Sequence, residues 1–94
     1  MDPRPTHTLP SVTLREWERA DLACLLGPLR GRRAIIVNAA GSHHGYRVWS
    51  EPMKDRSATI LWVVSEEAWW RHKHLAMSPE LIRWPAAAAW IEQE

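Results

Sequence analysis

Two adjacent histidines, His43 and His44, are the residues of this chain best suited to chemistry at neutral pH. Imidazole titrates near neutrality and is the commonest metal-binding side chain in proteins. The predicted topology places the pair beside Glu66 and Glu67, which raises the hypothesis of a small metal-assisted or acid–base enzyme. Adjacent histidines rarely bind one ion together, however, and the sequence lacks HExxH spacing. We therefore favour polar residues of a hairpin loop at 41–45 and keep the enzyme as an alternative.

No other motif points to catalysis. Cys24 is the only cysteine, so an intramolecular disulfide and a multi-cysteine zinc site are both excluded. Ser42 lies beside His43, but a catalytic triad also needs an orienting acid and an oxyanion hole, and the sequence shows neither. The four glycines form no phosphate-binding loop. We therefore predict a protein that is not an enzyme and that has no cofactor and no metal site.

A second candidate site consists of basic residues that the predicted topology brings to one end of the sheet. They are Arg30, Arg32, Arg33, Lys54 and Arg56. The arginine side chain binds phosphate and carboxylate through paired hydrogen bonds, so these residues suit nucleic acid as well as an acidic protein. A nucleic-acid complex of this kind would be weak and strongly dependent on salt. The alternative is a solvated rim in which Asp21 and Asp55 neutralise part of the charge.

Tryptophan is unusually frequent, with seven Trp, one Tyr and no Phe. Trp and Arg are enriched at the hot spots of protein interfaces, although the codon bias of a GC-rich genome explains the same composition. Neighbouring residues on a helix point about 100° apart, so Trp70 lies at the helix edge if Trp69 faces the core. We expect a protein-contact surface at this edge, formed by Trp70, Lys73, His74 and Met77. The alternative is that both indoles pack in the core.

Helix signals and strand signals divide the chain into elements. A helix is predicted from Thr13, which forms a capping box with Glu16, to the stop at Gly27-Pro28. β-branched and aromatic residues predict strands at 34–40, 46–51 and 59–65. The last strand is apolar on both faces, so we expect it to be central in the sheet or to meet a partner.

Two further helices are predicted after the third strand. Ser65 caps the first of them, which runs to about Met77. Ser78-Pro79 begins the other, and Pro85 interrupts it before residue 91. The resulting order, α-β-β-β-α-α, predicts a small α+β domain in which helices pack on a three-stranded antiparallel meander.

Length and composition predict one domain. A chain of 94 residues allows a single core, for which we assign residues 11–94, whereas the three prolines of residues 1–10 predict an extended or mobile arm. The formal charge of +1 argues against a dedicated DNA-binding domain. No apolar run approaches the roughly 20 residues of a membrane span. Without a signal peptide, and with one cysteine, we expect a soluble cytoplasmic protein.

These observations favour a non-enzymatic protein-binding module, a small inhibitor or adaptor that docks on a macromolecular partner. Small domains without family motifs are often of this kind, and many come from phages or mobile elements. An inhibitor of a bacterial defence system, such as an anti-CRISPR protein, is therefore one hypothesis. Nucleic-acid binding through the basic residues is the main alternative, and an exposed sheet face leaves a symmetric homodimer open.

Overall fold

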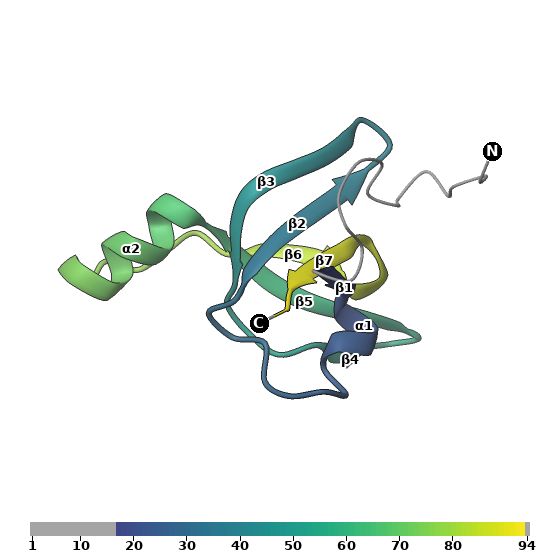
Figure 1. The fold of residues 1–94 in the computed structure, drawn as a ribbon. Coiled ribbons are helices and arrows are strands. Elements are labelled where there is room, and N and C mark those ends of the chain that lie inside the picture. Colours follow the sequence, from purple (N-terminus) through teal and green to yellow (C-terminus); the bar gives the residue numbers. More distant parts are fainter. Residues whose placement is uncertain (1–16, 94) are drawn as a thin grey trace.

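The computed structural model describes residues 17–93 and folds them into one curled antiparallel sheet, a half-barrel of seven strands (Figure 1). The strands are β1 Trp17–Arg19, β2 Arg33–Asn38, β3 Gly41–Val48, β4 Met53–Asp55, β5 Ala58–Ser65, β6 Ile82–Pro85 and β7 Ala89–Glu92. The helical segments are α1 Ala20–Ala23, α2 Glu66–Leu75 and the 3-10 helix η2 Ala86–Ala88. Strands make up 47% of the described residues and helices 22%, so this part of the chain is mostly β.

The predicted three-stranded meander packed with helices is therefore wrong, and its largest error lies in residues 78–91. This segment forms β6, η2 and β7 instead of a third helix. Alanine has the highest helix propensity, but Ala86, Ala88 and Ala89 are buried here, where small side chains let the chain pass close to the core. β7 alternates buried and half-buried residues, which is the pattern of a strand with one face inward.

The first predicted helix is also wrong in the part that the structure describes. Residues 17–19 form β1, whose backbone pairs with β7, and helix α1 has only four residues. Leu22, Leu25 and Leu26, which a long helix packed on the sheet would turn toward the core, are exposed. Thr13 and Glu16, like the predicted arm at 1–10, lie outside the described residues.

The outer face of β2 explains why β1 is a strand. Ile35 and Val37 point away from the main core, and Trp17 and Trp90 pack over them. Pairing with β7 satisfies the backbone of β1 and also places Trp17 over this apolar face. Burial of a large indole thus outweighs the local preference of residues 17–19 for helix.

Strand β5 has neighbours on both of its edges. Ile60 pairs with Met53 on β4 and with Pro85 on β6. Val63 likewise pairs with β3 on one side and β6 on the other. β3 and β4 therefore share one edge of β5, as one strand that is interrupted at residues 49–52. β5 is therefore central in the sheet, with strands paired along both of its edges.

The main core lies inside the curve of the sheet. Its fully buried side chains include Leu29, Val48, Leu61, Val63 and Ile91. They come from three strands, β3, β5 and β7, and from the turn before β2, so the core holds together segments that are distant in the sequence. Each such aliphatic side chain stabilises the fold by about 1.5–3 kcal/mol through burial.

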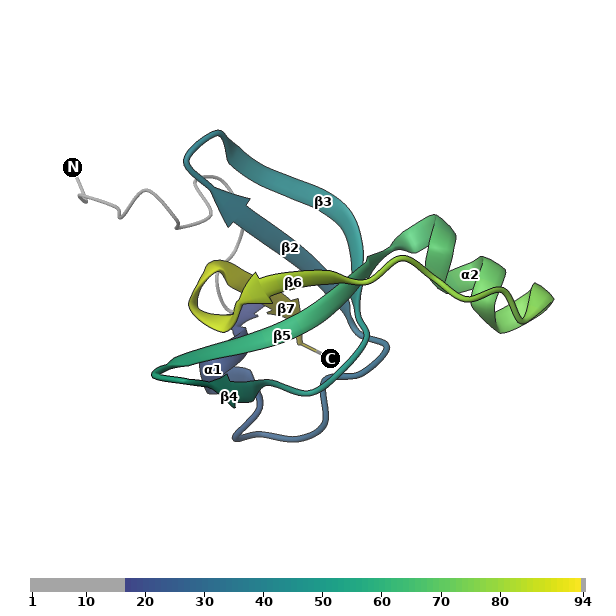
Figure 2. The same ribbon diagram turned by 180° about the vertical axis from the view of Figure 1, so that it is seen from behind.

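Helix α2 lies where the sequence predicts it. Ser65 Oγ accepts a hydrogen bond from the Ala68 N–H at 3.0 Å, and Ala76 ends the helix in the left-handed conformation. The helix projects from one end of the sheet, opposite the β4–β5 turn, and residues 76–81 return alongside it to β6 (Figure 2). Only Trp69 of its residues is buried. α2 has ten residues, and no described helix is long and apolar enough to cross a bilayer.

Candidate functional site

A hollow of about 480 Å³ lies where α2 joins the sheet. Its lining residues come from the turn before β2, from β2, β3 and β7, and from α2. They are the cations Arg30, Arg32, Arg33, Arg47 and Lys73, together with Gly31, Trp69 and Glu92. We call this site the basic hollow, because five of its side chains are positively charged and one is negatively charged.

The register of the sheet sets two arginines of the basic hollow side by side. Arg33 on β2 pairs with Arg47 on β3, and like charges directly opposite each other destabilise a sheet. Two carboxylates offset this repulsion. Arg33 Nε donates to Glu92 at 3.1 Å, and Arg47 Nε donates to Glu66 at 2.8 Å. The hydrogen bond to Glu92 also raises the pKa of the Arg33 guanidinium.

The other three cations, Arg30, Arg32 and Lys73, form no ion pair with a carboxylate in the described part of the chain. Two of them contact indole rings instead. Arg30 Cζ lies 4.8 Å from the ring centre of Trp49 and 5.2 Å from that of Trp69. Lys73 Nζ lies 5.7 Å from the ring centre of Trp69. Aromatic rings, and not carboxylates, therefore hold Arg30 and Lys73 in place.

Three tryptophans contact cations of the basic hollow. Trp49 and Trp69 contact each other edge to face, with ring centres 6.1 Å apart. Trp70 stacks on His74 at 5.6 Å, and Arg47 Cζ lies 5.1 Å from the Trp70 ring centre. Trp69 is 5% exposed and Trp70 is 42% exposed. The helix thus turns Trp69 inward and Trp70 outward, as the spacing of neighbouring helical residues predicts.

The four residues predicted to share a contact edge are divided between two surfaces. Trp70 and His74 stack on the exposed side of α2, whereas Lys73 lies over the Trp69 ring toward the basic hollow. Met77 follows the helix and lines a separate hollow of about 360 Å³ between α2 and the returning segment. The chain leaves the helix at Ala76, so helical spacing no longer applies to Met77.

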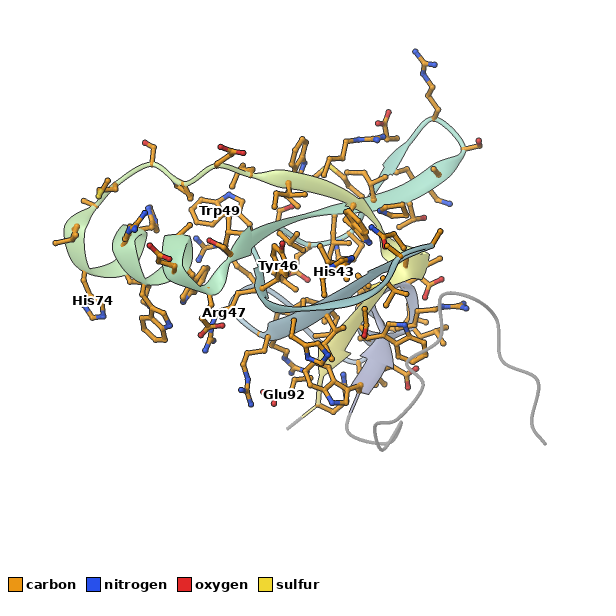
Figure 3. The ribbon with its side chains drawn as sticks, turned by 90° about the horizontal axis from the view of Figure 1, so that it is seen from above. His43, Tyr46, Arg47, Trp49, His74 and Glu92 are labelled. Atoms are coloured by element: carbon orange, nitrogen blue, oxygen red, sulfur yellow. The ribbon has the colours of Figure 1, made fainter. Side chains whose placement is uncertain are left out.

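Arg47 connects the sheet, the turn and the helix. Its Nη1 donates to the carbonyl oxygen of Gly31 at 2.7 Å, and its guanidinium pairs with Glu66 at 2.8 Å. Glu66 also accepts a hydrogen bond from Trp70 Nε1 at 2.9 Å. Figure 3 shows Arg47 at the joint between α2 and the sheet. One guanidinium thus fixes the position of α2 and of Trp70.

Glu51 holds the backbone of the turn that carries Arg30. Its carboxylate accepts the N–H groups of Leu29 and Arg30, each at 2.9 Å. The next residue, Gly31, has φ of +90°, and the Trp69 ring lies 3.4 Å from the place of a Cβ atom. The positive φ therefore favours glycine at position 31, and a side chain larger than a methyl group there meets the Trp69 ring.

Lys54 and Arg56 do not belong to the basic hollow. They lie in β4 and in the β4–β5 turn, next to Ala58, whereas Arg47 pairs with Val64 near the other end of β5. Ala58 and Val64 are six residue steps apart along β5, so the distance between them is roughly 20 Å. The expected gathering of all five basic residues is not observed, because β4 extends the second strand beyond the predicted turn and carries these two residues away.

The histidine pair lies within a strand and not in a hairpin loop. β3 begins at Gly41, and His43 Nε2 lies 3.2 Å from Asn38 Oδ1. His43 is distant from α2 (Figure 3), whereas His44 and Glu66 line the same shallow hollow of about 300 Å³. Among residues 17–93, no group of three or more His, Cys, Asp or Glu side chains is placed to hold a metal ion.

Arg47, Trp49 and Glu51 build the site, but the sequence analysis did not identify them. The alternation of the second strand contains a signal for two of them, because a buried Val48 places Arg47 and Trp49 on the outer face. No local pattern indicates the role of Glu51, since its partners are 21 and 22 residues distant in the sequence.

The arrangement is suited to binding an anion, since guanidinium groups pair with carboxylate or phosphate in two parallel hydrogen bonds. A scan against protein-family models matched no family, and searches of curated proteins and of solved structures found no match. The function is therefore inferred from the side chains of the basic hollow and of α2.

Proposed function

We propose that this protein is a non-enzymatic binding module, an inhibitor or adaptor, that docks on another protein at the joint between α2 and the sheet. The observation that carries the proposal is the meeting of three tryptophans with arginine and lysine side chains at this joint. Tryptophan and arginine are the side chains most enriched at interface hot spots. We call the basic hollow together with the exposed Trp70–His74 pair the joint surface. The free thiol of Cys24 suits a reducing compartment such as the cytoplasm.

The joint surface is held in position before any partner binds. Trp70 is exposed, but its contacts with Glu66, His74 and Arg47 fix the indole in one orientation. Arg30 is fixed in the same way by Trp49 and Trp69. Side chains that are already ordered lose little conformational entropy on association, so more of their interaction energy contributes to affinity.

Nucleic-acid binding is a second candidate, and the three cations without a carboxylate partner support it. The aromatic side chains favour a protein partner. Base stacking needs an open ring face, but Trp69 is buried and the ring of Trp70 already contacts His74 and Arg47. Glu66 also lies at the joint and repels phosphate. The formal net charge of +1 is small for a nucleic-acid-binding domain.

Photo-crosslinking from one position on α2 tests the docking proposal. In the full chain, His74 is replaced by p-benzoylphenylalanine, whose aromatic ring retains the stacking on Trp70. A matched variant carries the same residue in place of Lys54, at the other end of β5. Both are irradiated in a lysate of the source organism, once without and once with nuclease treatment.

We expect a discrete protein adduct from position 74 and none from position 54. Adducts of equal strength at both positions, or no adduct at either, would contradict docking at the joint surface. An adduct at position 74 that disappears after nuclease treatment would favour the nucleic-acid candidate instead.

A further inference from the structure

Three side chains of the basic hollow, Arg30, Arg32 and Lys73, carry positive charge without a carboxylate partner among residues 17–93. A concave site whose charged side chains are mostly of one sign concentrates the electric field and attracts the opposite charge, and five of the six charged side chains of the basic hollow are positive. We propose that the basic hollow is a subsite for an acidic segment of the protein partner, whose Asp or Glu carboxylates pair with these three side chains. This inference rests on the proposed function, because it names the chemistry that the joint surface recognises.

Arg30 is prepared to accept a carboxylate. The indoles of Trp49 and Trp69 lie close to its guanidinium, and Glu51 holds its backbone N–H. The Arg30 side chain forms no hydrogen bond and no ion pair within residues 17–93, so its N–H groups remain for an incoming anion. A carboxylate can meet a guanidinium with two parallel hydrogen bonds.

The protein already binds carboxylates of its own around the basic hollow. Glu92 pairs with Arg33, Glu66 pairs with Arg47, and Glu51 accepts backbone N–H groups of the turn. These contacts pair Arg33 and Arg47 and leave Arg30, Arg32 and Lys73 for an external ligand. Each carboxylate carries a single charge, so a further one suffers limited repulsion from those already present.

Charge also favours a carboxylate over a phosphate in this hollow. A phosphate monoester carries about −1.5 to −2 charges near neutral pH, compared with one for a carboxylate. Glu92 lines the hollow, and Glu66 borders it through Arg47, so a more highly charged anion is repelled more strongly. Side chains of an acidic peptide enter separately and can pair with the three cations one at a time.

Fluorescence anisotropy with a labelled peptide of alternating Glu and Gly residues tests this inference at low salt. The test variant is Arg32→Glu in the full chain, because the Arg32 side chain forms no hydrogen bond or ion pair within the described residues. We expect its affinity for the peptide to fall about tenfold or more, since an attractive charged contact becomes repulsive. Lys54→Glu makes the same change in net charge at the far end of β5 and should bind the peptide like the unaltered protein.

Three results would overturn the inference. An equal loss of affinity in both variants would show a response to net charge and not to the hollow. Equal binding of a Gln–Gly peptide would show that carboxylates are not recognised. Tighter binding of a single-stranded oligonucleotide than of the Glu–Gly peptide would assign the hollow to nucleic acid.

The crosslinking experiment separates this inference from the proposed function. If Arg32→Glu leaves the partner adduct at position 74 unchanged, docking is supported and the acidic segment is rejected. If the unaltered protein binds the Glu–Gly peptide through Arg32 but yields no adduct at position 74, the acidic subsite is supported and docking through α2 is rejected.

Discussion

The two ends of strand β5 both carry arginine and lysine, but they hold these charges differently. At the end that joins α2, Arg30 and Arg47 contact indole rings, and Arg47 hydrogen-bonds to a carbonyl and a carboxylate. At the far end, Lys54 and Arg56 are exposed and form no ring contact or ion pair within residues 17–93. Arg83 pairs there with an exposed aspartate.

The suitability of a surface for binding therefore depends on whether its charged side chains are held in one conformation, and not on their number. A long side chain in solvent loses conformational freedom when it binds, which offsets much of its attraction for an opposite charge. The rings and hydrogen bonds at the joint remove that freedom during folding. The joint surface is therefore the better candidate, although the far turn is also basic.

The largest change in stability is expected from a substitution that disturbs the packing of the turn against α2. Gly31→Val should lower the free energy of unfolding by about 3 kcal/mol, because valine is strained at φ of +90° and its methyl groups meet the Trp69 ring. Gly45→Val is the matched control, since Gly45 has φ of +85° but open space around it, and should cost about 1–2 kcal/mol. Urea denaturation followed by tryptophan fluorescence measures both. Equal losses would show that the Trp69 contact does not constrain the turn.

The next largest change in stability is expected when an arginine is removed at each end of β5 in turn. Arg47→Ala should cost about 2–3 kcal/mol, because Glu66 and the Gly31 carbonyl lose a partly buried, charged partner. Arg83→Ala removes an exposed ion pair at the far end and should cost at most about 1 kcal/mol. The same urea titration measures the two variants. The distinction between the two ends is lost if Arg83→Ala costs as much as Arg47→Ala.

The smallest effect concerns the carboxylate that holds the turn. Glu51→Gln should cost about 1 kcal/mol, because a charge-assisted acceptor of two backbone N–H groups becomes a neutral one. Hydrogen exchange at the amides of Leu29 and Arg30 should become faster, while other amides change little. Glu67→Gln, which alters an exposed pair with Arg71 on α2, should leave these two amides unchanged. Unchanged exchange in Glu51→Gln would show that the turn is held by other contacts.

Local signals in the sequence correctly predicted the elements whose stability is local. Ser65 and the glutamates that follow it predict the start of α2, and β-branched residues predict β2 and β5. The prediction was wrong where distant pairing decides the outcome. Residues 82–85 and 89–92 form strands because β5 and β2 offer unpaired edges, and residues 17–19 form a strand because β7 does.

By itself, the sequence determined that Trp69 and Trp70 point in different directions, that Arg30 to Arg33 form a basic turn, and that no intramolecular disulfide can form. Only the tertiary structure decided that Arg47, Trp49 and Glu51 surround this turn and that Lys54 and Arg56 lie at the other end of the sheet. The physical reason is the range of the interactions involved. Helix caps and side-chain periodicity act over a few residues, whereas strand register and ring contacts depend on residues that are distant in the sequence and meet only in the folded chain.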